Sequence, residues 1–170
     1  MKKFSFLLVV LACFMISCQD KQVLANLEEC ISQTKLEELN KSVVQRYWDG
    51  KWNERSPEIL DELLTQDVIN HGSDEINGIE EYKKSYSIYL SAVGETKIII
   101  DQLIAEGDRV MSQCRIQGIN NGPLFDIPPT GNEVNVRIFT VFRLVDGKIA
   151  EEWEIMDELT MMTQLGFELQ

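Results

Sequence analysis

VNVRIFTVFRLVDGKIAEEWEIMDELTMMTQLG, residues 134–166, decides the fold of this chain. Residues 134–144 are rich in β-branched and aromatic side chains, a composition that favours a packed strand. Asp146 and Gly147 suit a type I′ turn, because both central positions of that turn need a positive φ. We therefore expect an antiparallel hairpin whose return strand covers residues 148–156, followed by a short helix.

The return strand also supplies a candidate for chemistry. An unbroken alternation places four side chains on one face, namely Ile149, Glu151, Trp153 and Ile155. Asp157 continues that face at the end of the strand, beside the aromatic ring of Trp153. A carboxylate in an apolar, aromatic-lined place has a raised pKa and can move protons near neutral pH. The alternative role for Asp157 is to cap the helix that follows.

The first residues are typical of a secretory signal. Lys2 and Lys3 precede an apolar run, residues 4–12, that is too short to be a membrane span. The signal ends in MISC, residues 15–18, which resembles the lipobox of bacterial lipoproteins and contains Cys18. We expect residues 1–17 to be removed and Cys18 to be lipidated, which would anchor the protein at the cell envelope. A signal cleaved elsewhere, with Cys18 incidental, is the alternative.

Charge and cysteine content exclude several kinds of partner. The net charge is −12 at pH 7, so the surface repels nucleic acid and gives no attraction to anionic lipid. Membrane association is therefore expected through the N-terminal lipid only. Cys30 and Cys114 would remain in the folded part, either bridged or, as we favour, as two free thiols. One histidine and no CxxC pair predict no metal site.

The order of predicted elements indicates an α+β domain. Residues 18–33 are expected to be a polar tether, and residues 34–170 form the folded domain. Helices are predicted from Thr34, from Ser56 and after Gly78, because each position offers a cap or a break before an apolar periodicity. Strands follow from about residue 96. Helices first and an antiparallel sheet afterwards predict helices covering one face of a curved sheet.

Several segments, in this order, resemble the SnoaL-like polyketide cyclase family, whose members are also described as ester cyclases. The segments are DVINHG (67–72), GIEEY (78–82), IPPTG (127–131), DGKIAEEW (146–153) and QLG (164–166). The resemblance implies the cystatin-like, nuclear transport factor 2-like cone, in which three N-terminal helices pack on a curved, mainly antiparallel sheet. It also implies an apolar pocket between the sheet and the helices.

The resemblance further implies that an aspartate at the position of Asp157 acts as general acid/base in a ring closure, without metal or cofactor. His71 is its expected partner, with a structural role as the alternative. Many relatives carry histidine where this chain has Glu152. The residues expected to line the ligand pocket are Trp153, Phe139, Tyr86 and Ile155.

Three classes of function remain open at this point. The first is an enzyme that acts on a small hydrophobic carbonyl compound by acid/base chemistry. The second is a module that binds such a molecule without turning it over. The third is an interaction domain that forms a homodimer through the open face of its sheet.

Overall fold

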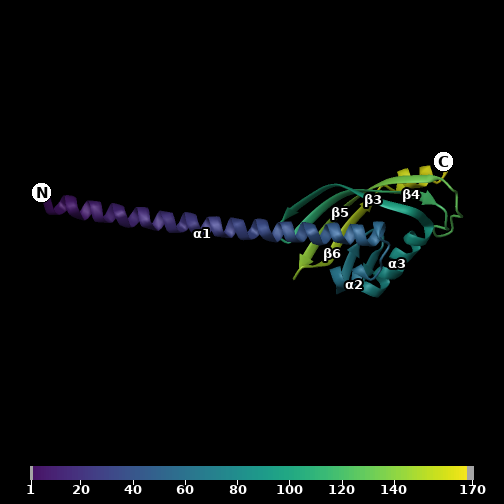
Figure 1. Cartoon of the computed structure of the whole chain (residues 1–170), viewed down its shortest axis with the longest axis horizontal. Coiled ribbons are helices and arrows are strands. Elements are labelled where there is room, and N and C mark those ends of the chain that lie inside the picture. Colours follow the sequence, from purple (N-terminus) through teal and green to yellow (C-terminus); the bar gives the residue numbers. More distant parts are fainter. Residues whose placement is uncertain (1, 168–170) are drawn as a thin grey trace. The chain divides into compact units, whose positions relative to one another are not determined.

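The computed structural model describes residues 2–167, with side chains from residue 21 onward. By its contacts the chain divides into two compact units, with the boundary in the sequence between Leu36 and Glu37. Helix α1, Lys2–Trp48, runs through the first unit and into the second (Figure 1). The side chain of Cys18 lies outside the described part, so its lipidation and the boundary at residue 17 stay predictions.

The helix expected to begin at Thr34 begins much earlier. Thr34 lies inside α1, and its hydroxyl donates to the carbonyl oxygen of Cys30 at 3.0 Å instead of capping a helix end. The segment expected to be a tether is therefore helical. Within the described residues, no helix is long and apolar enough to cross a membrane.

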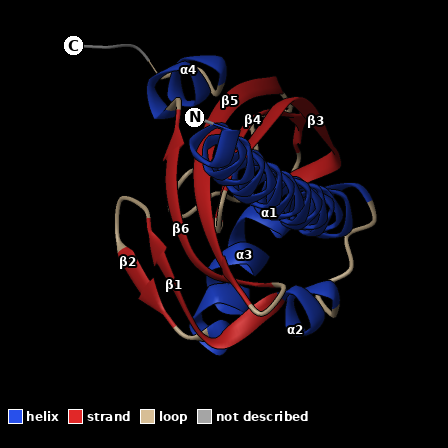
Figure 2. Ribbon diagram, turned by 90° about the vertical axis from the view of Figure 1, so that its left-hand side faces the viewer, coloured by secondary structure: helices blue, strands red, loops and turns tan. Residues whose placement is uncertain are grey.

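The second unit contains the elements that follow α1. They are η1 (Asp49–Asn53), α2 (Ile59–Leu63), β1 (Leu64–His71), β2 (Glu75–Asn77), α3 (Ile79–Ala92), β3 (Val93–Glu106), β4 (Arg109–Asn120), β5 (Glu133–Val145), β6 (Lys148–Met156) and α4 (Glu158–Gln164). The six strands form one sheet in the order β2-β1-β6-β5-β4-β3. All neighbours are antiparallel except β1 and β6. The predicted α+β class, with helices on a curved and mainly antiparallel sheet, is confirmed (Figure 2).

The predicted hairpin of β5 and β6 forms the middle of this sheet. Asp146 and Gly147 have φ values of 49° and 76°, as a type I′ turn requires. Tyr47 and Trp48, from the end of α1, pack edge-to-face against Phe142 of β5, with ring centroids 5.3 and 5.9 Å away. All three side chains are fully buried. This aromatic cluster holds the last turns of α1 on the concave face of the sheet.

Strand β6 carries a bulge that the sequence did not reveal. Arg143 pairs with Glu151, but the next residue, Leu144, pairs with Ile149. Ala150 is therefore an extra residue with no partner on β5. An insertion of one residue moves every later side chain to the opposite face of the sheet.

The bulge overturns the expected alternation of the return strand. Ile149 is buried in the core, and beyond the bulge the residues on this concave face are Glu152 and Glu154. Trp153 and Ile155, which were expected beside Ile149, face the other way, and Ile155 is 75% exposed. The prediction of one continuous face was therefore wrong.

Cys30 and Cys114 are both free thiols in the structure. Cys30 is exposed on α1, whereas Cys114 is buried on β4. Burial raises the pKa of the Cys114 thiol to about 12, so this cysteine is an unreactive core residue.

Candidate functional site

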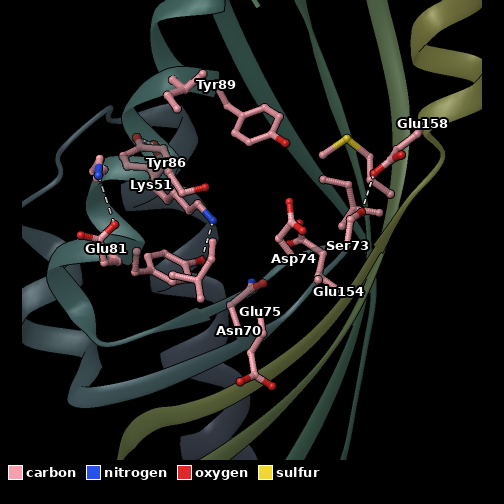
Figure 3. Close-up of a pocket in the computed structure, with 18 of the residues that line it drawn as sticks. Lys51, Asn70, Ser73, Asp74, Glu75, Glu81, Tyr86, Tyr89, Glu154 and Glu158 are labelled. Atoms are coloured by element: carbon pink, nitrogen blue, oxygen red, sulfur yellow. Dashed lines mark hydrogen bonds and ion pairs between the residues drawn. The ribbon is translucent and has the colours of Figure 1, made fainter. Parts of the chain in front are cut away.

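A cavity of about 570 Å³ lies within the second unit, between the concave face of the sheet and helix α3 (Figure 3). This volume is in the range of small-molecule sites. Much of its wall is aromatic, and the rings come from Trp48, Trp52, Tyr82, Tyr86, Tyr89 and Phe125. Carboxylates and two amines are added by β6, α4, the β1–β2 segment, α3 and η1. The cavity therefore combines apolar walls with a few charged groups.

A hydrogen-bonded network forms the inner end of the cavity. The Lys51 ammonium donates to the Tyr47 hydroxyl at 2.7 Å and to the Tyr82 hydroxyl at 2.8 Å. The Tyr47 hydroxyl donates to Glu152 Oε2 at 3.1 Å, and the Asn70 amide donates to Glu152 Oε1. The buried cation and the buried carboxylate are thus linked through hydroxyl groups, which offsets the cost of removing them from water.

Both tyrosines of this network stay protonated over the physiological range. Burial raises the pKa of Tyr47 and of Tyr82 well above the ordinary value, and the negative charge of Glu152 adds to the effect. The hydroxyl groups therefore do not ionise, and they link Lys51 to Glu152 by hydrogen bonds.

Lys51 is also held by aromatic rings. Its Nζ atom lies between 4.9 and 5.7 Å from the centroids of five rings, those of Tyr47, Trp48, Trp52, Tyr82 and Tyr86. Each contact is a cation–π interaction that favours the charged ammonium at this place. The Lys51 side chain is 6% exposed, so its charge has a fixed position. Figure 3 shows its nitrogen directed into the cavity.

Glu154 is the carboxyl group best suited to proton transfer in this cavity. It lies on β6, lines the cavity and is partly buried. Burial raises the pKa of Glu154 to about 7, Lys51 opposes the rise, and the charge of Glu152 adds to it. The Thr140 hydroxyl lies 3.5 Å from the Glu154 carboxylate. A group with a pKa near 7 can both accept and donate a proton at neutral pH.

Glu154→Gln is expected to raise the free energy of unfolding at pH 8 by about 1–3 kcal/mol. With a pKa of about 7 instead of 4.5, Glu154 keeps its proton in the folded state at pH values where the unfolded chain has lost it. Its contribution to stability is therefore full below pH 4.5 and is lost as the pH rises through 7. Urea unfolding of both proteins at pH 4 and pH 8 measures this effect. Equal stabilities at pH 8 would contradict the raised pKa.

Asp157 does not lie where the sequence placed it. Its carboxylate caps the N-terminus of α4, accepting from the Thr160 backbone N–H at 3.0 Å and from the Thr160 hydroxyl at 2.7 Å. These hydrogen bonds lower the pKa of Asp157, and the residue is exposed and does not line the cavity. The expected pocket position and raised pKa are wrong because the bulge at Ala150 changes the faces of β6. The contacts of Asp157 are those of a helix cap, which was the alternative role considered from the sequence.

His71 lies on the outer face of the sheet. Its ring stacks on Trp153, with centroids 4.9 Å apart and planes 13° apart, and its Nε2 atom is 3.1 Å from Glu151. Strand β1 pairs with β6 so that Asn70 is beside Glu152 and His71 is beside Trp153. Because side chains alternate along a strand, Asn70 reaches the cavity and His71 does not. The expected place of His71 in the pocket is therefore wrong.

Of the four residues expected to line the pocket, one does so. Tyr86 lines the cavity, and its hydroxyl donates to the Lys51 carbonyl oxygen. Trp153, Phe139 and Ile155 lie on the outer face instead, and Phe139 pairs directly with Ile155 across the two strands. Within the described residues, no cluster of three or more His, Cys, Asp or Glu side chains could hold a metal ion.

The fold agrees with that of a known family. A model of the SnoaL-like polyketide cyclases matches residues 42–165. A structure described as a SnoaL-like polyketide cyclase, from Jannaschia sp. CCS1, is 25% identical, with a TM-score of 0.73, over 79% of this chain and 96% of that chain. TsrD from Streptomyces laurentii is 26% identical, with a TM-score of 0.70, over 76% and 96%.

The same architecture occurs in a structure described as an epoxide hydrolase. The LEH-like epoxide hydrolase of M. tuberculosis is 18% identical, with a TM-score of 0.61, over 76% of this chain and 90% of that chain, and shares the fold. A search of the curated proteins gave no match. On the match of the family model, this chain belongs to the SnoaL-like polyketide cyclase family.

Proposed function

We propose that this domain takes a small, largely apolar carbonyl compound into its cavity and moves a proton on it with Glu154. The observation that carries the proposal is a carboxyl group with a pKa of about 7 in an aromatic-walled cavity. Membership of a cyclase family supports the reaction class, because a ring closure between carbonyl groups begins with removal of a proton from carbon. The fold alone would not identify the chemistry.

The proposed step is enolisation. The Glu154 carboxylate takes a proton from the carbon next to the carbonyl, and the C–H electron pair forms the carbon–carbon double bond of an enolate. Negative charge then collects on the carbonyl oxygen, where a fixed cation stabilises it. Lys51 is suited to this role, because its described hydrogen bonds use two of its three N–H donors. The enolate carbon can attack a second carbonyl carbon, or it can take the proton back.

Proton exchange on 2-tetralone tests this step without knowledge of the natural substrate. In deuterium oxide we expect the protein to exchange the α-protons of 2-tetralone faster than buffer, as followed by NMR. Because the base is the ionised form of Glu154, the rate should rise with pH and level off above about 7. Binding of 2-tetralone without accelerated exchange would contradict the catalytic proposal and leave a ligand-binding module.

We also propose that the protein is exported and held at the cell envelope by lipid on Cys18. The support is the N-terminal sequence, with its basic start, apolar run and MISC. Two or more acyl chains are enough for stable anchoring. After expression of the full chain in a bacterium, mass spectrometry should show a mature protein that begins at an acylated Cys18. The Cys18→Ala variant should be absent from the membrane fraction. An unmodified, soluble wild-type protein would refute the proposal.

A homodimer through the outer face of the sheet is a further part of the proposal. Ile155 and Phe139 pair across β5 and β6 and are 75% and 46% exposed. Exposed Ile104 pairs with Met111 on the same sheet. Contiguous exposed apolar side chains are typical of an interface.

Ile155→Lys is expected to convert this dimer to a monomer, because the charge would be buried in an apolar contact. Analytical ultracentrifugation of both proteins measures the change. The matched control is Leu39→Lys, an exposed apolar residue of α1, away from the outer face of the sheet. A wild-type protein that remains a monomer at all concentrations would refute the interface.

A further inference from the structure

We propose that the ligand of this cavity carries a basic amine, which lies at the cavity mouth against Asp74 and Glu154. The inference rests on the proposed binding of a small molecule in this cavity and narrows the class of that molecule. It concerns recognition, so it can be tested apart from proton transfer by Glu154.

The mouth of the cavity has an excess of negative charge. Five acidic residues line the cavity, namely Asp74, Glu75, Glu81, Glu154 and Glu158, and the Glu75 carboxylate is directed to His71 on the outer face. Two of them have a cationic or ionisable partner, since Glu81 pairs with Lys84 at 3.3 Å and Glu75 lies 3.4 Å from His71. Glu158 accepts a hydrogen bond from the neutral hydroxyl of Ser73 at 2.8 Å.

Asp74 and Glu154 are the carboxylates left to meet a ligand. Among the described residues, Asp74 has no ion pair or hydrogen bond, and Glu154 has one long contact, to the Thr140 hydroxyl. Figure 3 shows Asp74 and Glu154 on the same side of the cavity, across from the hydroxyl of Tyr89. Burial raises the pKa of Tyr89, and the charges of Glu154, Glu158 and Asp74 add to the rise.

Among the described residues, neither lysine that lines the cavity forms an ion pair with Asp74 or Glu154. The Lys51 ammonium is fixed at the inner end, where hydroxyls and aromatic rings surround it. At the mouth, Tyr89 and Phe125 form an edge-to-face pair with centroids 5.8 Å apart, and both line the cavity. Carboxylates combined with aromatic faces attract ammonium groups. The net charge of −12 also draws cations toward the protein and repels anions.

A second feature of the cavity is a buried indole N–H without an acceptor. Trp52 lines the cavity, is 5% exposed, and its indole N–H has no hydrogen-bond acceptor among the described residues. A buried donor without an acceptor is rare and needs an explanation. A carbonyl or hydroxyl oxygen of the ligand would satisfy it. The inferred ligand therefore has an oxygen acceptor on a flat apolar body and a basic amine at the mouth end.

Three probes with the same flat body and different charge test the amine. They are 2-naphthylmethylamine, 2-naphthalenemethanol and 2-naphthoic acid, titrated into the protein by calorimetry at pH 7 and 150 mM salt. We expect the amine to bind at least about tenfold more tightly than the alcohol, and the acid to bind most weakly. An alcohol or acid that binds as tightly as the amine would overturn the inference.

The Asp74→Asn variant tests whether the preference for the amine probe arises at the cavity mouth. The variant is expected to weaken amine binding about fivefold and to leave alcohol binding unchanged, because it removes charge and keeps shape. Asp146→Asn, in the exposed β5–β6 turn, is the matched control and should leave both affinities unchanged. A wild-type protein that exchanges 2-tetralone normally but shows no preference for the amine would reject this inference alone. Amine preference without exchange would reject only the proposed catalysis.

Discussion

Glu154→Gln is expected to lower the rate of 2-tetralone α-proton exchange by about 10²- to 10⁴-fold, the usual effect of removing a general base. Glutamine keeps the size and the hydrogen-bonding outline of the side chain but cannot take up a proton. Binding of 2-tetralone should therefore change by less than about twofold. NMR exchange rates and a binding titration on the same sample separate the two effects.

Asp157→Asn is the matched control for this experiment. Both substitutions exchange a carboxylate for an amide near the end of β6, but Asp157 caps α4 outside the cavity. We expect normal exchange by this variant, with a loss of stability of about 0.3–1 kcal/mol, because asparagine still caps the helix but lacks the negative charge that favours its N-terminus. If Asp157→Asn abolishes exchange and Glu154→Gln does not, the residue predicted from the sequence is the base and the assignment to Glu154 is wrong.

Local patterns in the sequence were enough to predict the α+β class and the central hairpin. The composition of β5 and the Asp146-Gly147 turn predicted the central hairpin, because each depends on neighbouring residues only. The helix after Gly78 was also predicted correctly, since Gly78 has a φ of 86° and precedes two acids in the first turn of α3. Such signals act over a few residues, so a single sequence displays them.

The site was predicted less well because one residue changed the parity of a strand. Ala150 is the extra residue of the bulge, and neither glycine nor proline marks it. With the alternation interrupted there, the acid that reaches the cavity is Glu154 and not Asp157. The run Glu151-Glu152-Trp153-Glu154 offered three acids close to the tryptophan, but it contained no signal to choose between the two faces.

The network at the inner end depends on contacts between distant parts of the chain. Tyr47 and Glu152 are 105 positions apart, and Asn70 and Glu152 are 82 apart. Pairing of β1 with β6 brings Asn70 to Glu152, and the packing of α1 brings Tyr47. Nothing in the local sequence around Lys51 indicates a buried ammonium. Its identification as a site residue needs the fold.

The loop of residues 121–132 forms one wall of the site, and Asn120 holds it. The Asn120 side chain is fully buried and makes four hydrogen bonds. Its amide nitrogen donates to the carbonyl oxygens of Ala92 and Gly122, and its oxygen accepts from the backbone N–H and the hydroxyl of Thr130. Phe125, which lines the cavity, lies within this loop. The amide thus ties the end of α3 to both ends of a cavity wall.

Asn120→Ala is expected to lower the free energy of unfolding by about 2–4 kcal/mol, because buried carbonyl and N–H groups lose their partners. Urea unfolding at pH 7 measures the loss, and exposed Asn121→Ala, the matched control, should change stability by less than about 0.5 kcal/mol. Where the variant stays folded, 2-tetralone should also bind more weakly, since the Phe125 wall is no longer fixed. A loss below about 1 kcal/mol with unchanged binding would show that the backbone bonds from Asn120 to Gly131 and Asn132 hold the loop without the side chain.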